Sequence, residues 1–312
     1  MRILCWHVHG SWMTAFVQGP HDYFVPVNAA RDADGRGRAQ SWEWPPNVHE
    51  VCEDAARDLP FDVVVLQRPQ ELHGSASRWL GGREPGRDVP AVYLEHNTPP
   101  GPVCDMRHPA ADRPDIVVVH CTYCNALFWD TGTTPTRVIP NGVVDPGYRY
   151  SGELPRAAVV INEAARRGRA TGTDLLGRFA TTVPVDLFGM DACRLGGCAE
   201  LSQPELHDAL ARRRLYVHPN RWTSLSLSLL EAMHLGLPVV AVATTEVAEA
   251  VPCDCGYVSN DIDRLIAGTR ELLHEPERAR VMGQAARRAA RARHGLEPFL
   301  AAWDEVLEEV CA

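Results

Sequence analysis

The segment 216–242 contains the residues whose types and spacing best suit binding of a phosphorylated ligand. A short apolar strand is followed by a loop, and the pattern then predicts a helix over 224–235 that stops at Gly236. Thr223 or Ser224 is expected to cap this helix. The helix then begins at the carboxyl edge of a parallel sheet, where its free N–H groups suit a diphosphate.

Glu231 is expected two turns inside the same helix. A carboxylate at that place can accept two hydrogen bonds from a ribose diol. An isolated glutamate on a helix more often forms an ion pair at the surface. Both interpretations remain open from this segment alone.

A second group of polar residues follows the first strand of the chain. The run Gly10-Ser11-Trp12 precedes a helical stretch over 13–18, and a glycine turn there lets the backbone approach a ligand closely. Side chains nearby could line a pocket, although a histidine buried beside a strand is equally common. These residues are His7, His9, Trp12, Gln18 and His21. Further along, Glu95-His96-Asn97 ends another strand.

The elements that must position these residues form two α/β halves. Short β-branched runs alternate with helical stretches, which is typical of parallel sheets flanked by helices. The strands are expected at residues 3–8, 62–66, 89–94, 116–119 and 137–139 in the first half, and at 157–161, 183–188, 215–217, 238–242 and 256–258 in the second. A turn-rich stretch over 140–147 separates them. We therefore expect Rossmann-like domains at 1–152 and 153–312, an acceptor domain and a nucleotide-sugar domain, with the last helix packing back on the first domain as a further expectation.

Three stretches depart from this alternation. Residues 29–50 are expected to form a polar loop and an aromatic-rich turn, and residues 74–88 an exposed loop. The stretch 275–312 is strongly helical, and six arginines lie between Arg278 and Arg293. These arginines are interpreted as a solvated helix face, with peripheral contact at a membrane surface as the alternative.

The composition is that of a packed globular protein with 312 residues and a net charge of −9. Such a charge opposes binding to nucleic acid. The chain contains no lysine, so an anion site must use arginine, backbone N–H groups or helix N-termini. It has no apolar run long enough to span a membrane and no signal peptide at its beginning, which favours the cytoplasm.

The ten cysteines are expected to be reduced thiols. Cys121 and Cys124 have the spacing of a zinc or redox site, which His120 and Cys104 could complete. Buried thiols at a strand end and in the next helix are the preferred interpretation. The pairs Asp32-x-Asp34 and Asp261-x-Asp263 imitate a metal-binding motif but are interpreted as loop or helix-cap residues.

The second half resembles family 4, or group 1, glycosyltransferases, which have the two-domain GT-B fold with a ligand cleft between the domains. Several stretches agree with the family in order, over about 136–312. They are Val138-Ile-Pro-Asn-Gly-Val143, Gly172-Thr-Asp-Leu-Leu176, Leu187-Phe-Gly189, the Glu231-Ala-Met-His-Leu-Gly-Leu-Pro-Val-Val240 run, and Met282-Gly283. The resemblance before residue 136 is weaker.

Two departures from the family pattern concern the donor site. The family has two glutamates with seven residues between them; Glu231 matches the second, which holds ribose, whereas the first falls on Thr223. The family's phosphate-binding lysine falls on Thr171, just after three arginines. Since a guanidinium can bridge two phosphates, Arg166 or Arg167 is expected to take the charge of the leaving group.

The resemblance implies roles for the other residues singled out above. His96 falls where a family histidine contacts the donor sugar, and it joins Arg166 and Arg167 as a catalytic candidate. The expected donor-binding residues are Gly10, Ser11, Thr171, Gly189, Asn220, Thr223, Ser224, Leu225, Ser226, Leu227 and Glu231. The expected acceptor-binding residues are His9, Trp12 and Gln18.

The activity that the resemblance implies is a retaining, metal-independent transfer from a UDP- or GDP-linked sugar to an acceptor hydroxyl, with no cofactor. The acceptor, a small molecule or a glycan, is not identified, nor is the oligomeric state. The missing first glutamate favours, as an alternative, a non-catalytic protein that binds nucleotide sugars. A nucleotide-sugar epimerase or a phosphorylase on the same scaffold is the other alternative. A Rossmann oxidoreductase is disfavoured, because no GxGxxG follows the first strand.

Overall fold

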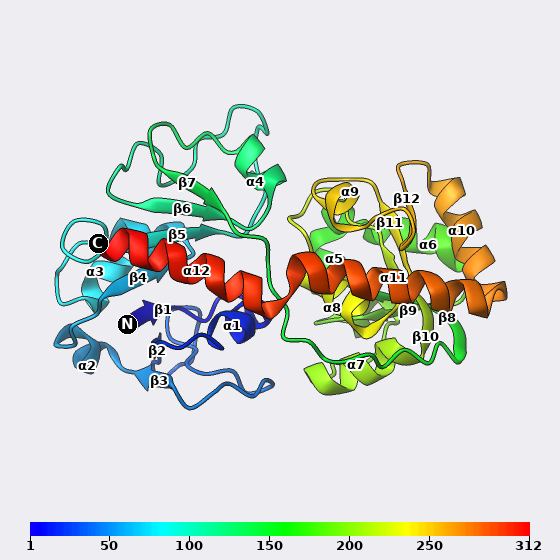
Figure 1. Ribbon diagram of the computed structural model, residues 1–312, viewed down its shortest axis with the longest axis horizontal. Helices are drawn as coiled ribbons and strands as arrows, with labels where there is room; N and C mark the ends of the chain where they lie inside the picture. Colours follow the sequence, from blue (N-terminus) through cyan, green and yellow to red (C-terminus); the bar gives the residue numbers. More distant parts are fainter. The chain divides into compact units, whose positions relative to one another are not determined.

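The computed structural model describes all 312 residues, which form two compact α/β units (Figure 1). The first unit comprises Met1–Gly142 and Leu296–Ala312, and the second comprises Val143–Gly295. The chain passes into the second unit ahead of the expected boundary near residue 152. The reason is that Val143 is buried in the core of the second unit, where its N–H donates to the carbonyl of His294. The last helix belongs to the first unit.

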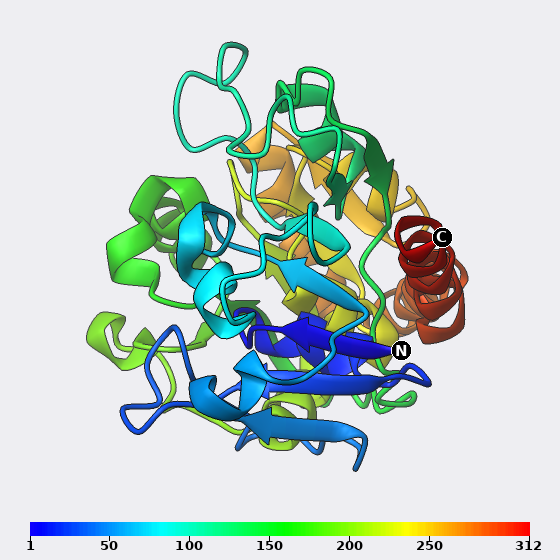
Figure 2. The same ribbon diagram turned by 90° about the vertical axis from the view of Figure 1, so that its left-hand side faces the viewer.

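The first unit has a seven-stranded sheet in the order β3-β2-β1-β4-β5-β6-β7, and all its ladders are parallel. Its strands are β1 (Arg2–Cys5), β2 (Asp22–Pro26), β3 (Val48–Val51), β4 (Val63–Leu66), β5 (Ala91–Glu95), β6 (Val117–His120) and β7 (Thr136–Val138). Its helices are α1 (Gly10–Phe16), α2 (Glu53–Arg57), α3 (Ala76–Trp79), α4 (Tyr123–Phe128) and α12 (Leu296–Cys311). Figure 2 shows β1 to β3 side by side in blue.

Two strands and one helix of the first unit were not expected. β2 follows a Gly-Pro turn, and its Tyr-Phe-Val run is an ordinary strand signal. β3 lies at the edge of the sheet and exposes His49 and Glu50, so no apolar run marks it. The predicted exposed loop over 74–88 is wrong in part, because α3 buries Trp79 to 2% exposure beneath the sheet's apolar face.

Aromatic side chains cover one face of this first sheet. Trp12 and Phe16 of α1 pack against Phe299 and Trp303 of α12, with ring centroids 4.9 to 6.3 Å apart. The opposite face carries a separate apolar cluster that includes Trp6. Both faces are therefore buried, as a parallel sheet requires.

The second unit has a five-stranded parallel sheet in the order β12-β11-β10-β8-β9. Its strands are β8 (Leu154–Val160), β9 (Val185–Phe188), β10 (Arg213–His218), β11 (Val239–Val242) and β12 (Gly256–Ser259). Its helices are α5 (Ala164–Arg167), α6 (Leu176–Ala180), α7 (Gln203–Arg212), α8 (Leu227–Leu235), α9 (Val247–Ala250), α10 (Ile262–His274) and α11 (Pro276–His294). Short single turns lie at Gly168–Thr171, Thr173–Leu175 and Ala192–Leu195. All five expected strands are confirmed, with small shifts at their ends.

Helix α11 packs closely on the turn that ends α8. A Cβ added to Gly283 would lie 2.0 Å from the carbonyl oxygen of Gly236, which is itself in the left-handed conformation that favours glycine. Replacing Gly283 with alanine should therefore force the helix away and destabilise the protein by about 1–3 kcal/mol. Urea denaturation measures the change.

Gly177→Ala is the matched control, because nothing lies within 4 Å of the added methyl group on α6. That substitution should leave stability unchanged or raise it by up to about 1 kcal/mol, since alanine favours the helix. Equal stabilities of the two variants would show that α11 does not approach Gly236 as closely as described.

Candidate functional site

The strand order of the second unit reverses between β8 and β10, and ligands bind at such switch points in open α/β sheets. The loops that follow these two strands are held against each other. The backbone N–H groups of Arg221 and Trp222 donate to the carbonyl of Ala170, at 2.9 and 3.0 Å. A Cβ on Gly172 would lie 2.0 Å from the carbonyl oxygen of Pro219, so this approach requires glycine. The two loops together form one edge above the sheet.

Helix α8 begins at Leu227 on this edge, and Ser226 precedes it without a side-chain cap. The predicted start and cap at Thr223 or Ser224 are wrong. The loop continues to Leu225 because the Asn220 amide donates to Thr223 Oγ1 at 3.0 Å and the Leu225 side chain is buried in the core. The uncapped N-terminus of a nine-residue helix offers free N–H groups to an anion.

The arginines that follow β8 differ in their partners. Arg166 is exposed and forms an ion pair with Glu163, and Arg169 forms one with Asp174. Arg167 forms no ion pair, although the charge of the nearby Glu163 carboxylate also acts on it. Partial desolvation and then the neighbouring charge of Arg166 lower the pKa of Arg167, and the guanidinium remains charged at neutral pH. Of the two predicted leaving-group cations, Arg167 is thus the one left available to an anion.

Glu231 lies one turn inside α8, nearer its N-terminus than expected, because the helix begins at Leu227. Its side chain is buried and faces α7. Its Oε1 accepts a hydrogen bond of 3.0 Å from Gln203 Nε2, and its Oε2 lies 3.4 Å from His207 Nε2. The interpretation of Glu231 as part of a surface ion pair is therefore wrong. Gln203 and His207 were missed, although the Ser202–Glu205 capping box marks their helix in the sequence.

The remaining donor candidates of the second unit differ in their access to a ligand. The carboxamide oxygen of Asn220 is buried and has no hydrogen-bond partner. Ser226 Oγ contacts Ser228 Oγ, which in turn contacts the Tyr216 hydroxyl. Gly189 has a φ of +117° at the end of β9, where a Cβ would lie 2.5 Å from the carbonyl of Ile161. Glycine is therefore required there by the chain itself.

Two predicted donor contacts lie in the interior instead. Thr171 is fully buried, and its hydroxyl bonds to the Gly168 carbonyl and to Thr173. Leu225 packs in the core of the second unit. Neither side chain can reach a ligand, because the loop around them closes on itself. Leu227 and Ser224 are partly exposed at the start of α8.

In the first unit, the carboxyl ends of β1, β4 and β5 bring three polar side chains together at the corresponding switch point. His96 is buried, and its Nε2 lies 2.9 Å from the Gln67 Oε1. The ring of His9 stands 4.1 Å from that of His96, centroid to centroid. Burial, and then the neighbouring His9, hold the pKa of His96 well below its ordinary value. Gln67 was missed, although it directly follows an expected strand.

The predicted acceptor group does not assemble as expected. Trp12 is 1% exposed and packs in the aromatic cluster with α12. Gln18 lies beyond the far end of α1 from His9 and donates to the Thr14 carbonyl. His21 pairs with Asp304 of α12. Both His9 and Trp12 contact the His96 ring, at 4.1 and 5.4 Å between centroids, but only His9 is exposed.

Gly10 and Ser11 form the first turn of α1, but the glycine does not leave its surface open. A Cβ on Gly10 would fall within 1.4 Å of a ring atom of Trp42, whose indole lies against the glycine. The aromatic turn expected over residues 42–46 therefore folds onto α1, and Trp44 Nε1 donates to Thr14 Oγ1. The glycine accommodates this indole rather than a bound ligand.

The cysteines and paired aspartates do not form metal sites. No group of three or more His, Cys, Asp or Glu side chains is arranged to hold a metal ion. The cysteines are free thiols, and Cys121 is buried. Asp261 caps α10 by accepting from the N–H groups of Asp263 and Arg264, and Asp34 pairs with Arg68. The interpretation of both aspartate pairs as cap and loop residues is confirmed.

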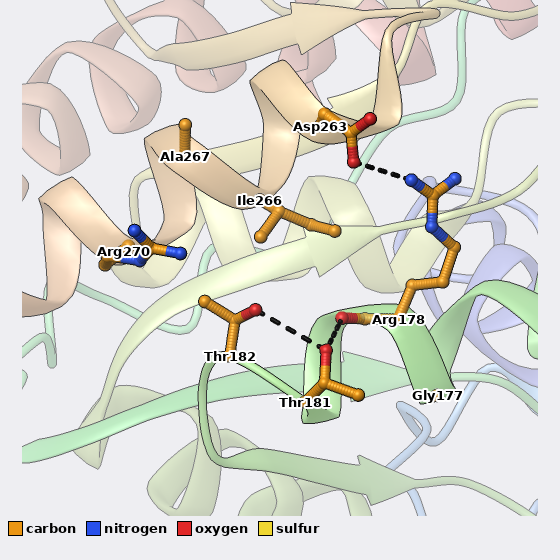
Figure 3. A pocket seen from close by; sticks show the side chains of 8 residues that line it. All are labelled: Gly177, Arg178, Thr181, Thr182, Asp263, Ile266, Ala267 and Arg270. Atoms are coloured by element: carbon orange, nitrogen blue, oxygen red, sulfur yellow. Dashed lines mark hydrogen bonds and ion pairs between the residues drawn. The ribbon is translucent and has the colours of Figure 1, made fainter.

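A surface hollow between α6 and α10 lies away from the switch point (Figure 3). It is lined by Arg178, Thr181, Thr182, Asp263, Ile266 and Arg270, among others. Its Arg178 is engaged by Asp263 at 2.6 Å. Because this hollow opens on the helices that flank the sheet, it is not the site that the switch point predicts.

The arginines of α11 are mostly neutralised by carboxylates of the same unit. Arg287 and Arg291 pair with Asp145, and Arg293 pairs with Glu246. Arg278 and Arg280 pair with Glu271 and Glu277. The expected solvated helix face agrees with these contacts better than a membrane stripe does. None of the helices is both long enough and apolar enough to cross a bilayer.

The chain is similar to known glycosyltransferases in part of its sequence and in its fold. Residues 199–289 match the family model for glycosyl transferases group 1. Over 93 residues the chain is 36% identical to the sulfoquinovosyl transferase SQD2 of Arabidopsis thaliana, a match that covers 28% of this chain and 18% of that protein. The chain thus spans less than a fifth of that relative.

Solved structures of similar fold cover both units at low sequence identity. Sucrose-phosphate synthase from Thermosynechococcus elongatus superposes with a TM-score of 0.75 at 12% identity, over 99% of each chain. The Anabaena HepE protein, solved in complex with UDP-glucose, gives 0.68 at 15% identity, over 99% of this chain and 100% of that one.

The fold is the one that these glycosyltransferase structures have, the GT-B architecture of two parallel-sheet α/β units. Within the second unit, the stretch that matches the group 1 glycosyltransferase model includes the loop after β10, α8 and most of α11.

Proposed function

We propose that this chain transfers a sugar from a nucleoside diphosphate to an acceptor hydroxyl, with retention of the anomeric configuration and without a metal ion. One observation carries the proposal. Arg167, which forms no ion pair, and the uncapped N-terminus of α8 follow adjacent strands at the switch point of the group 1 domain. Together they supply the positive charge that a departing diphosphate requires.

The other residues have roles in the proposed transfer that follow from their chemistry. Glu231 would hold the ribose diol, with Gln203 and His207 fixing the carboxylate. His96 of the first unit would contact the donor sugar. As the bond to the diphosphate breaks, positive charge develops at the anomeric carbon. The acceptor hydroxyl must then be held on the same face, so catalysis rests on positioning and on stabilising the leaving group.

UDP is the nucleotide we propose for the donor. HepE has been solved with UDP and with UDP-glucose, and its fold matches this chain over nearly the full length. A thermal-shift and calorimetric panel of UDP, GDP and TDP, in buffer with EDTA, tests this choice. Product formation from the preferred sugar nucleotide and pooled acceptors tests the activity. Nucleotide binding without any product would favour a non-catalytic binding protein, for which Thr223 in the place of the first family glutamate is the argument.

Replacing Glu231 with alanine should weaken binding of the preferred nucleotide by at least about 1 kcal/mol, or roughly fivefold in Kd, because the ribose loses its acceptor. Calorimetry with UDP measures the change. Glu231→Gln keeps a side-chain oxygen near Gln203 and should lose less affinity. Glu200→Ala, at an exposed glutamate of the same unit, is the control. Unchanged affinity in folded Glu231→Ala would remove this residue from the site.

A further inference from the structure

Gln67 lies between two groups that together fix the orientation of its amide. It is 5% exposed and directly follows β4. Its Nε2 lies 2.7 Å from the carbonyl oxygen of Trp6, and its Oε1 lies 2.9 Å from His96 Nε2. A carbonyl can only accept a hydrogen bond, so the amide nitrogen must face Trp6. The amide oxygen, which also can only accept, then faces His96.

This orientation determines where the proton of His96 resides. Because Gln67 Oε1 accepts, His96 Nε2 must carry the hydrogen and donate it. Burial and the neighbouring His9 keep the pKa of His96 low, so the ring is neutral at physiological pH. A neutral imidazole protonated at Nε2 has its lone pair on Nδ1, which can accept a hydrogen bond but cannot donate one.

The backbone of Gln67 is itself held in place by a buried carboxylate. Glu71 is fully buried, and its Oε2 accepts from the N–H of Gln67 at 2.6 Å and from that of Arg68 at 3.2 Å. Arg68 also donates through its side chain to Glu71. This pairing restrains the residue that orients the imidazole. Burial raises the pKa of the Glu71 carboxyl against the opposing effect of Arg68, which also pairs with Asp34.

We propose that Gln67 is a positioning residue that holds His96 in the Nε2-protonated tautomer, so that Nδ1 accepts a hydrogen bond from a hydroxyl of the donor sugar. The tautomer follows from the first unit alone, whereas the contact with the sugar rests on the proposed function. The chemistry selects a hydroxyl, because a neutral nitrogen lone pair is attracted to an O–H donor and repels another acceptor.

Nitrogen-15 NMR of the free protein tests the tautomer directly, without any sugar nucleotide. The two ring nitrogens of a neutral histidine give well-separated signals according to which one is protonated. His96→Gln identifies the His96 signals by their disappearance. We expect His96 to show a protonated Nε2 and an unprotonated Nδ1, and to stay neutral through the pH range in which an exposed histidine titrates. A protonated Nδ1, or an even mixture of tautomers, overturns the proposal.

Two substitutions separate orientation by Gln67 from a merely structural role. Gln67→Glu places a carboxylate beside Nε2, which stabilises the imidazolium and should raise the His96 pKa by at least about one unit. Gln67→Met removes the acceptor and should give a mixture of tautomers. The groups that face His96 are His9 and Trp12 on the α1 side and the Cys121 thiol, 3.5 Å from the His96 carbonyl oxygen, with Glu71 and Arg68 beyond Gln67. His9→Gln therefore measures the contribution of His9 to the pKa separately.

Gln70→Glu is the matched control, because Gln70 is exposed and three residues further along the chain. It adds the same charge and should leave the His96 signals unchanged. If Gln67→Glu and Gln70→Glu shift His96 equally, Gln67 does not orient the ring. NMR signals that differ from these expectations reject the positioning role of Gln67. If UDP does not bind, the proposed function is rejected, but the conclusion about the His96 tautomer still holds.

Discussion

Arg167→Ala should lower the turnover of the preferred sugar nucleotide by about a hundredfold, since loss of one preorganised group that stabilises transition-state charge costs factors of that size. Steady-state kinetics with the donor selected by the binding panel measure the loss. Because the guanidinium is proposed to act on the departing diphosphate, kcat should fall more than the affinity for the intact donor. Arg167→Lys should recover part of the activity, as a charge without bidentate geometry.

Arg166→Ala is the control for this prediction, and the structure supplies the reason. Arg166 is the preceding residue on the same short helix, but it is exposed and pairs with Glu163. Its removal should change turnover by no more than about twofold, as is usual at an exposed surface position. Equal losses of turnover in both variants would mean that the Arg166–Glu163 ion pair does not separate the roles of the two arginines. A loss of turnover in Arg166→Ala alone would contradict the assignment of Arg167 as the cation that stabilises the leaving diphosphate.

Trp303→Ala should destabilise the first unit by about 3–5 kcal/mol, the range for truncating a large buried aromatic side chain. Trp303 is 1% exposed and contacts Trp12, Phe16 and Phe299. Since it lies on α12, its loss also removes the main anchor of the C-terminal helix. Urea denaturation followed by circular dichroism measures the change, with each unit's transition fitted separately because a chain with two units need not unfold in one step.

Leu127→Ala is the control for Trp303, because Leu127 lies on α4 of the same unit and is 78% exposed. Its stability should stay within about 0.5 kcal/mol of the wild type. A change below about 1 kcal/mol in Trp303→Ala would show that α12 is not packed on α1 in solution. Trp303→Phe should restore much of the loss, since a phenyl ring keeps most of the apolar contacts.

The central strands of both sheets were predictable because they are buried on both faces and read as apolar runs. The strands over 62–66 and 238–242 begin within a residue of their expected positions. β3 was not predicted because an edge strand with His49 and Glu50 exposed lacks an apolar run. The start of α8 was misplaced for a different reason. Thr223 and Ser224 are good caps in isolation, but the backbone bonds of Arg221 and Trp222 to Ala170 keep this stretch in a loop.

The residues of the candidate site were likewise predictable only in part. His96 and Asn220, which lie just after a strand, and Arg167, on the short helix that follows β8, could be found from the sequence because the carboxyl ends of parallel strands converge. Gln67 satisfies the same rule and was overlooked. Trp12 and Gln18 were grouped by closeness along the chain. A helix, however, turns one of them into the core and carries the other to its far end.

The sequence by itself determined the two α/β halves, the glycosyltransferase resemblance and the set of arginines available to a phosphate. These properties depend on local patterns and on the residue types present. Only the tertiary structure decided which arginine forms no ion pair, which way Glu231 points and which nitrogen of His96 carries its proton. Each of those depends on a partner brought close by folding, and a pairing between distant residues leaves no mark in the spacing of either one.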